Sequence, residues 1–164
     1  MVILGIDPAL TKTGWGIISS VNNSLSFIAC GTIKTDAKQS LDERLYHIHK
    51  SIGEVIAEYQ PNEVAIEETF VNKNPVSSLK LGHARGVLML SAAIAGLKIS
   101  EYASTSIKKT VVGVGRAEKS QVGVMIKYLL PKSDAKTEDE SDALAVAICH
   151  NNFRKISSFQ KRSI

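Results

Sequence analysis

Four carboxylates in this chain of 164 residues occupy positions where a side chain could do chemistry. Asp7 and Glu67 each close a short apolar run with the composition of a buried strand. Asp139 and Asp142 are three residues apart, a spacing that places both on one face of a helix. An ionised carboxylate at the end of a buried strand is costly unless a cation lies close by. Rigidly held oxygen ligands are what hard divalent cations require.

The remaining metal-ligating residue types point away from zinc. Cys30 and Cys149 are far apart and form no Cys-x-x-Cys pair, which favours two reduced core thiols over a disulfide or a thiolate site. Magnesium or manganese is therefore the predicted ion. Two such ions ~4 Å apart can activate a water molecule and stabilise a pentacovalent phosphorus. The histidines are scattered along the chain: His47, His49, His83 and His150.

Each carboxylate also has a structural interpretation. Asp7 precedes a proline and could serve a turn, and Asp139 and Glu140 could favour the dipole of a helix in its first turn. Glu67 could be a solvated strand end, which is the interpretation we give to its neighbour Glu68. The four acids together, however, describe two strand-end ligands and one helical pair, and this combination predicts a divalent metal site.

The charge of the chain is unevenly distributed. The net charge is +4, with a pI near 9.1. Residues 36–68 hold eight acids and three bases, whereas residues 70–132 hold ten bases and two acids. A basic surface suits a polyanion such as DNA or RNA. An acidic centre within a basic surround predicts a nuclease that works through metal ions.

The elements that must position these acids follow from hydrophobic periodicity. Capping boxes at Ser40–Glu43 and Thr137–Glu140 mark two helix starts. The first three strands are joined by short turns and predict an antiparallel meander. The order of strands and helices predicts an α/β fold with a mixed sheet. We expect strands at residues 2–7, 15–19, 25–35, 64–66 and 99–103, and helices at 41–59, 77–97, 104–112, 117–130 and 138–150.

Length and composition predict one independently folding domain. We expect a single nuclease domain at residues 1–150 and a basic C-terminal tail at 151–164 that lacks clear periodicity. The longest nearly uncharged apolar stretch, residues 86–97, is shorter than the ~20 residues of a membrane span. The N-terminus lacks the features of a secretory signal, so we expect a cytoplasmic protein without a membrane partner.

Seven short motifs together resemble the RuvC family of bacterial Holliday-junction resolvases. They run in the family's order and cover nearly all of residues 3–150. The resemblance implies an RNase H-like fold, with a mixed five-stranded sheet flanked by helices. The motifs are GIDP at 5–8, TGWG at 13–16, AIE at 65–67, SLKLG at 78–82 with ARG at 84–86, TVVG at 110–113, AEKSQV at 117–122 and DESDALA at 139–145.

The resemblance also implies an activity. Family members are homodimers that nick two symmetric strands of a four-way DNA junction, leaving 5′-phosphate and 3′-hydroxyl ends in DNA recombination and repair. It implies two Mg²⁺ ions per subunit, for which Mn²⁺ can substitute, and cooperation with the branch-migration proteins RuvA and RuvB. Our expectation for the dimer contact is the helix at 77–97, whose small residues permit close approach of another backbone.

By the same resemblance, the catalytic and metal-binding acids are Asp7, Glu67, Asp139 and Asp142, whereas Glu68 and Glu140 match no catalytic position. Lys119 is implied to be catalytic, as a cation near the scissile phosphate; the alternative is a solvated helix lysine. The implied DNA-binding residues are Phe70, Lys80, Arg85, Lys108, Lys109 and Lys119.

Two of these assignments leave a structural alternative open. Phe70 could stack on an opened base or belong to the core. Arg85 could contact a phosphate or close an ion pair. The chain also departs from the family pattern: Trp15 replaces a usual tyrosine, and Ala9 stands where the family usually has glycine. Ala9 would carry ~1 kcal/mol of strain if that position needs a positive φ.

Three rival functions remain. One is another RNase H-like nuclease that acts on RNA or duplex DNA, which the match at Phe70 and at residues 79–86 disfavours. The second is an actin-like ATPase or sugar kinase, which would need two domains where this length supplies one. The third is a junction-binding module without catalysis, which the presence of all four acids disfavours.

Overall fold

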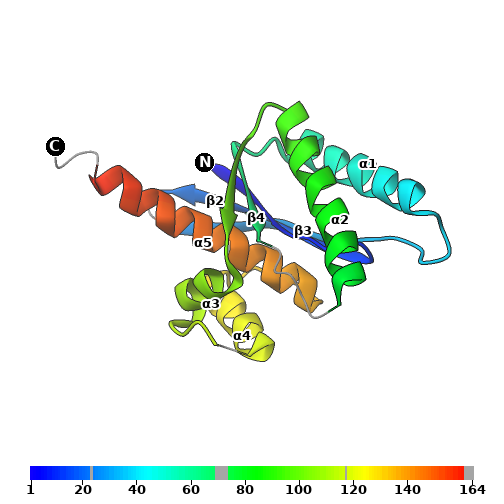
Figure 1. Cartoon of the computed structure of the whole chain (residues 1–164). Coiled ribbons are helices and arrows are strands. Elements are labelled where there is room, and N and C mark those ends of the chain that lie inside the picture. The colour runs from blue at the N-terminus through cyan, green and yellow to red at the C-terminus, as the bar shows by residue number, and fades with distance from the viewer. Residues whose placement is uncertain (23, 69–73, 117, 161–164) are drawn as a thin grey trace.

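The computed structural model describes residues 1–160 except 23, 69–73 and 117; for Lys119 and residues 155–160 it describes the backbone alone. Within this part of the chain, the strands form one sheet (Figure 1). Its strand order is β3-β2-β1-β4-β5. β1, β2 and β3 pair antiparallel, and β4 and β5 run parallel to β1. The strands are β1 (Val2–Asp7), β2 (Lys12–Val21), β3 (Ser24–Lys34), β4 (Glu63–Glu67) and β5 (Lys98–Tyr102).

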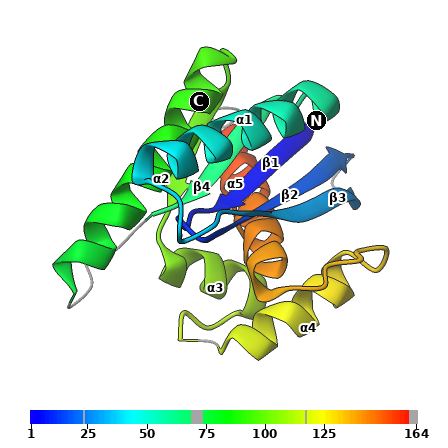
Figure 2. The ribbon, with the colours of Figure 1, turned by 90° about the vertical axis from the view of Figure 1, so that its right-hand side faces the viewer.

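Helices cover both faces of the sheet, as Figure 2 shows. α1 and α2 pack on one face, where they share a core with Leu4 and Ile6 of β1. α5 crosses the other face and packs on Ile3 and Ala65, with α3 and α4 beside it. The mixed five-stranded sheet flanked by helices confirms the expected fold class. The helices are α1 (Leu41–Tyr59), α2 (Pro75–Ile94), α3 (Ser104–Val112), α4 (Lys119–Leu129) and α5 (Glu138–Gln160).

Three glycines let α5 lie directly on the strands. A Cβ added to Gly5 of β1 would stand 2.2 Å from the carbonyl oxygen of Ala143. One added to Gly14 of β2 would stand 2.0 Å from the carbonyl oxygen of Asp139, and one added to Gly16 would meet Leu144. A side chain at any of these positions would therefore push the helix off the sheet.

Several element boundaries differ from those expected. β2 begins at Lys12 instead of residue 15, because its first residues pair with the end of β3. α2 begins at Pro75, where the side chain of Asn74 caps it. Both capping boxes are confirmed: the Ser40 hydroxyl accepts from Glu43 N–H, and the Thr137 hydroxyl accepts from Glu140 N–H.

The expected end of the last helix at His150 is wrong, since α5 continues to Gln160. The added turns pack on the body of the protein. The ring of Phe153 lies 5.4 Å from that of Tyr102, and Arg154 forms a 3.3 Å ion pair with Glu63. These contacts involve residues distant in sequence, and local periodicity does not reveal them.

A polar network ties the second half of α5 to the sheet. His150 Nε2 lies 2.7 Å from Glu63 Oε2, and its Nδ1 lies 2.8 Å from the Tyr102 hydroxyl. Burial by itself would raise the pKa of Glu63, but the His150 hydrogen bond and the Arg154 charge outweigh burial and lower the pKa. Glu63 is thus held as a carboxylate.

Both cysteines are free thiols. Cys149 is buried and Cys30 is partly exposed. Burial raises the pKa of Cys30 to about 12 and that of Cys149 to about 11. Thiols with such pKa values are poor nucleophiles and poor metal ligands.

Within the described residues, no helix has both the length and the apolar character needed to cross a membrane.

The glycine contacts lead to a stability prediction. Gly5→Ala should lower the free energy of unfolding by about 2–3 kcal/mol or more, because the new methyl group meets backbone atoms that cannot yield. Urea denaturation measures this change. The matched control is Gly53→Ala in α1, where a Cβ has nothing within 4 Å and helix propensity should give a neutral or stabilising effect. Equal effects of the two substitutions would contradict the packing argument.

Candidate active site

A pocket of about 140 Å³ opens where β1 and β4 end. Three of the four predicted acids line it, together with one lysine, one hydroxyl group and two apolar side chains. The lining residues are Asp7, Glu67, Ser104, Ile107, Lys108, Val122 and Asp142.

The parallel pairing of β1 and β4 brings the first two acids together. Ile6 pairs with Ile66, so Asp7 and Glu67 end neighbouring strands at the same level. Strands in a sheet lie ~4.8 Å apart, which makes these two carboxylates close neighbours. Both side chains are half-buried.

The other two acids, Asp139 and Asp142, lie in the first turns of α5, near the end of the chain. The Asp139 backbone rests on Gly14, and Gly14 is the β2 partner of Asp7. One turn further along, Asp142 reaches the pocket. Asp139 itself does not line the pocket, and its side chain is half-buried.

The neighbouring acids have other roles, as expected. Glu140 completes the α5 cap: its carboxylate accepts from the N–H groups of Lys136 at 2.6 Å and Thr137 at 3.1 Å. Its Oε1 also accepts from the Thr32 hydroxyl of β3 at 3.4 Å. Glu68 is exposed. The cap therefore sets where α5 begins and, with it, where Asp139 and Asp142 lie.

A buried arginine holds the turn that follows Asp7. Arg44 of α1 is only 8% exposed, and none of the ion pairs among the described residues involves it. Its guanidinium donates to the Thr35 hydroxyl at 2.9 Å, the Thr11 hydroxyl at 3.1 Å and the Leu10 carbonyl at 3.3 Å. Hydrogen bonds to three neutral oxygens thus offset the cost of burying the guanidinium charge. The same bonds fix the conformation of the turn.

Ala9 sits in this turn without the strain that a positive φ would bring. Among the described residues other than glycine, only Asn22 and Gln60 have positive φ. The Thr13 hydroxyl donates to the Ala9 carbonyl and accepts from the Ala9 N–H at 3.4 Å. Alanine therefore costs nothing in backbone conformation at the position where the family usually has glycine.

The donor set fits a hard divalent cation. The pocket offers carboxylate oxygens, and no histidine or cysteine is among its lining residues. In the described part of the chain, no three acidic, histidine or cysteine side chains are close enough together to hold an ion as they stand.

The predicted cationic residues differ in their relation to the pocket. Lys108 lines it, whereas Lys109 on the same helix and Lys80 on α2 are exposed elsewhere. Lys119 begins α4 one turn before the pocket residue Val122, but its side chain lies outside the described part. Arg85 forms an ion pair with Glu101 of β5, which favours the structural alternative for this residue.

The remaining assignment, Phe70, lies outside the described residues. Sequence reasoning did not single out Ser104, Ile107 or Val122 as pocket residues. A topological signal existed for Ser104, because it follows β5 at the sheet edge where Asp7 and Glu67 stand.

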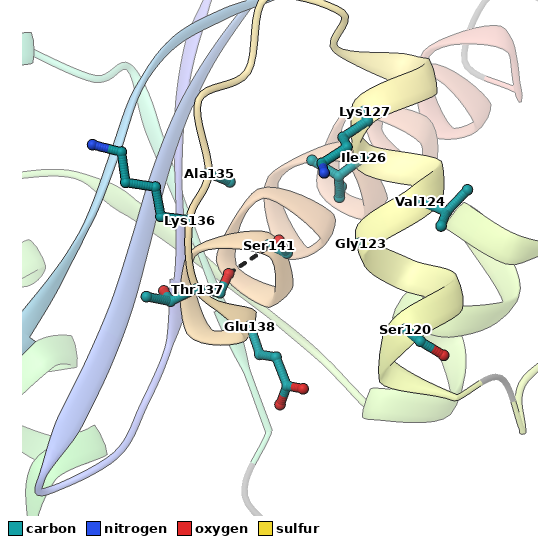
Figure 3. A pocket seen from close by; sticks show the side chains of 10 residues that line it. All are labelled: Ser120, Gly123, Val124, Ile126, Lys127, Ala135, Lys136, Thr137, Glu138 and Ser141. Carbon is teal, nitrogen blue, oxygen red and sulfur yellow. Dashed lines mark hydrogen bonds between the residues drawn. The ribbon is translucent and has the colours of Figure 1, made fainter.

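A larger pocket of about 270 Å³ lies between α4 and the start of α5 (Figure 3). None of the four acids lines it. Its α5 wall includes Glu138 and Ser141, the residues that directly precede Asp139 and Asp142. The Ser141 hydroxyl donates to the Thr137 carbonyl at 3.1 Å, as the dashed line in Figure 3 marks.

The sequence model of the family described as crossover junction endodeoxyribonuclease RuvC matches residues 3–150. The chain belongs to this family. It is 56% identical over 154 residues to the RuvC of Paramagnetospirillum magneticum, covering 94% of this chain and 93% of the relative. It is 50% identical over 162 residues to that of Azorhizobium caulinodans, covering 99% and 96%. The resemblance seen in the motifs is confirmed, and the rival RNA or duplex nuclease is not favoured.

Solved structures of two Holliday junction resolvases share the fold. One is described as T. thermophilus RuvC in complex with Holliday junction substrate, with a TM-score of 0.88, 29% identity and 96% of both chains covered. The yeast mitochondrial Holliday junction resolvase Ydc2 has a TM-score of 0.68 and 10% identity, with 99% of this chain and 84% of that chain covered. The second likeness concerns the fold alone.

The turn after Asp7 leads to a prediction about Arg44. Arg44→Met should lower the free energy of unfolding by about 1.5–3 kcal/mol through the lost charge-assisted hydrogen bonds. It should also slow DNA cleavage, because Asp7 loses its fixed turn. Thermal unfolding and a single-turnover cleavage assay measure the two effects. Lys50→Met on the exposed side of α1 is the control, and it should change the free energy of unfolding by no more than ~0.5 kcal/mol. An Arg44→Met protein as stable and active as the control would refute this role.

Proposed function

We propose that the chain is an endodeoxyribonuclease that resolves four-way (Holliday) DNA junctions, with Asp7, Glu67, Asp139 and Asp142 as its catalytic acids. The observation that carries the proposal is the meeting of three of these acids with Lys108 in one pocket of a RuvC-family chain. Residues 1–150 would form the nuclease domain, in keeping with the span that matches the family.

The four acids would hold Mg²⁺, two ions per subunit, with Mn²⁺ as a substitute. When bound, such ions supply Lewis acidity and lower the pKa of water. In the reaction, a water molecule would give up a proton and attack phosphorus, and the bond to the 3′ oxygen would break as that oxygen takes up a proton. The phosphate stays on the 5′ end of one fragment, and the other fragment ends in a 3′-hydroxyl group.

The other pocket residues have supporting roles. Lys108 would bind a phosphate oxygen of the strand being cut and offset the negative charge that develops there. Lys119 would act in the same way from the start of α4. Ile107 and Val122 line the pocket with apolar side chains and would limit the access of bulk water. Exposed Lys80 and Lys109 would contribute sequence-independent contacts to the DNA backbone.

The geometry of the substrate calls for two copies of the chain. One pocket can cut one strand, whereas two strands must be cut to resolve a junction. α2 offers a surface for the second copy: Leu79, Leu90 and Ile94 are 64%, 57% and 69% exposed. Gly86 lies between them, with nothing within 4 Å of where a Cβ would stand. We propose that α2 pairs with α2 of the second subunit, and that RuvA and RuvB are partners of the dimer.

The catalytic assignment predicts a separation of binding from cleavage. Asp7→Asn should bind a four-way junction with near wild-type affinity in Mg²⁺, yet cut it at least about 100-fold more slowly, because a metal ligand is lost. Gel-shift and strand-cleavage assays on the same junction measure both steps. Glu68→Gln is the control, an exposed acid beside Glu67 that should leave cleavage unchanged. Normal cutting by Asp7→Asn would disprove the assignment.

The dimer proposal predicts a change of mass in solution. Leu90→Glu should yield a folded monomer, because a charge placed in an apolar helix contact must be desolvated on association. Analytical ultracentrifugation measures the mass, and circular dichroism checks the fold. Val124→Glu on α4, where Val124 is 67% exposed, should remain a dimer. If Leu90→Glu sediments like the wild-type protein, α2 is not the contact.

A further inference from the structure

Two lysines stand directly opposite each other at the ends of β2 and β3. Lys12 and Lys34 are Cα partners in the antiparallel pairing, and both are exposed. Like charges at directly opposed positions destabilise a sheet, whereas an opposite pair would stabilise it. The fold itself therefore gains nothing from this arrangement, and an external anion would remove the repulsion.

The lysines rise from the same face of the sheet as the catalytic acids. Gly14 faces α5, because its missing Cβ would meet Asp139. Lys12 precedes Gly14 by two residues and so points to the same face. Lys34 is opposite Lys12, and Thr32 is opposite Gly14. The hydroxyl of Thr32 lies 3.2 Å from that of Thr137 at the α5 cap, which confirms the direction.

Two acids near Lys34, Asp36 in the chain and Glu140 in the fold, are held by hydrogen bonds of their own. The Asp36 carboxylate accepts from the N–H of Lys38 at 2.9 Å, and Glu140 serves the α5 cap. No ion pair among the described residues includes Lys12 or Lys34. Both ammonium groups are thus available to a ligand in solvent.

Their position relative to the pocket suggests the ligand. Lys12 is two residues along β2 and one strand across from Asp7, so the two backbones are ~8 Å apart, and Lys34 is ~12 Å from Asp7. Lys108, which lines the pocket, belongs to α3, and α3 directly follows β5 on the other side of β1 from β2 and β3. Cations therefore stand on both sides of the carboxylates, along the edge where β1 and β4 end.

We propose that Lys12 and Lys34 form a subsite for DNA backbone phosphates next to the scissile phosphate, on the side of the pocket opposite Lys108. The strand being cut then crosses the sheet edge from α3 to β3 over the acids. This inference rests on the proposed function, because it places the same DNA strand.

The first test separates binding from folding. Lys12→Gln/Lys34→Gln should bind a four-way junction about tenfold more weakly at low salt. The plot of log association constant against log salt concentration should become shallower, its negative slope shrinking in magnitude by about 2. Its thermal midpoint should be equal to or higher than that of the wild-type protein, because the cross-strand repulsion is gone. A purely structural role would instead lower the midpoint and leave the salt slope unchanged.

The matched control removes the same charge elsewhere. Lys50 lies on α1, which covers the other face, and Lys98 begins β5 at the far end of the sheet. Both are exposed. Lys50→Gln/Lys98→Gln should bind and cut as the wild-type protein does. If both double variants weaken binding equally, the effect is one of net charge, and the subsite does not exist.

The second test locates the contact. The probe is a set of junctions in which one phosphate near the cleavage site is replaced by a neutral methylphosphonate, at a different position in each junction. Wild-type binding should weaken whenever the replaced phosphate is one that the protein contacts. At one or two positions on one side of the scissile phosphate, Lys12→Gln/Lys34→Gln should show a smaller loss than the wild-type protein, because the contact is already absent. Equal losses at every position would overturn the subsite. A wild-type protein that cuts no junction would instead overturn the proposed function.

Discussion

The contact between α5 and the glycines of β1 and β2 is the constraint on which the site depends. Gly5, Gly14 and Gly16 carry no side chain, so the helix backbone rests on the strand backbones. This contact brings Asp139 and Asp142, near the end of the chain, to Asp7 near its beginning. If a side chain separated α5 from the strands, the core would remain apolar. Asp139 and Asp142 would then lie too far from Asp7 to share a site with it.

Two further devices keep this contact in register. The Thr137–Glu140 cap fixes the first residue of α5 and links it to Thr32 of β3. Arg44 fixes the turn between β1 and β2 from the opposite face of the sheet. Hydrogen bonds from both layers thus hold the polypeptide around Asp7.

The electrostatics of the molecule follow from the same geometry. Carboxylates gathered at one sheet edge would repel a DNA strand, so the chain needs cations around them. Lys108 supplies one from α3, and the pair of Lys12 and Lys34 stands at the same edge on the other side. The basic segment at residues 70–132 supplies only some of the cations around the pocket, because Lys12 and Lys34 lie outside that segment.

The sequence by itself determined the strand-end acids, the capped helical pair, the α/β class and the family, because local periodicity, capping chemistry and motif order are written in neighbouring residues. It missed the last turns of α5, which depend on Tyr102 and Glu63. Only the tertiary structure decided that Arg85 pairs with Glu101, that Ala9 is unstrained and that Lys12 faces Lys34. These outcomes depend on strand register and layer packing, which join residues that no local pattern relates.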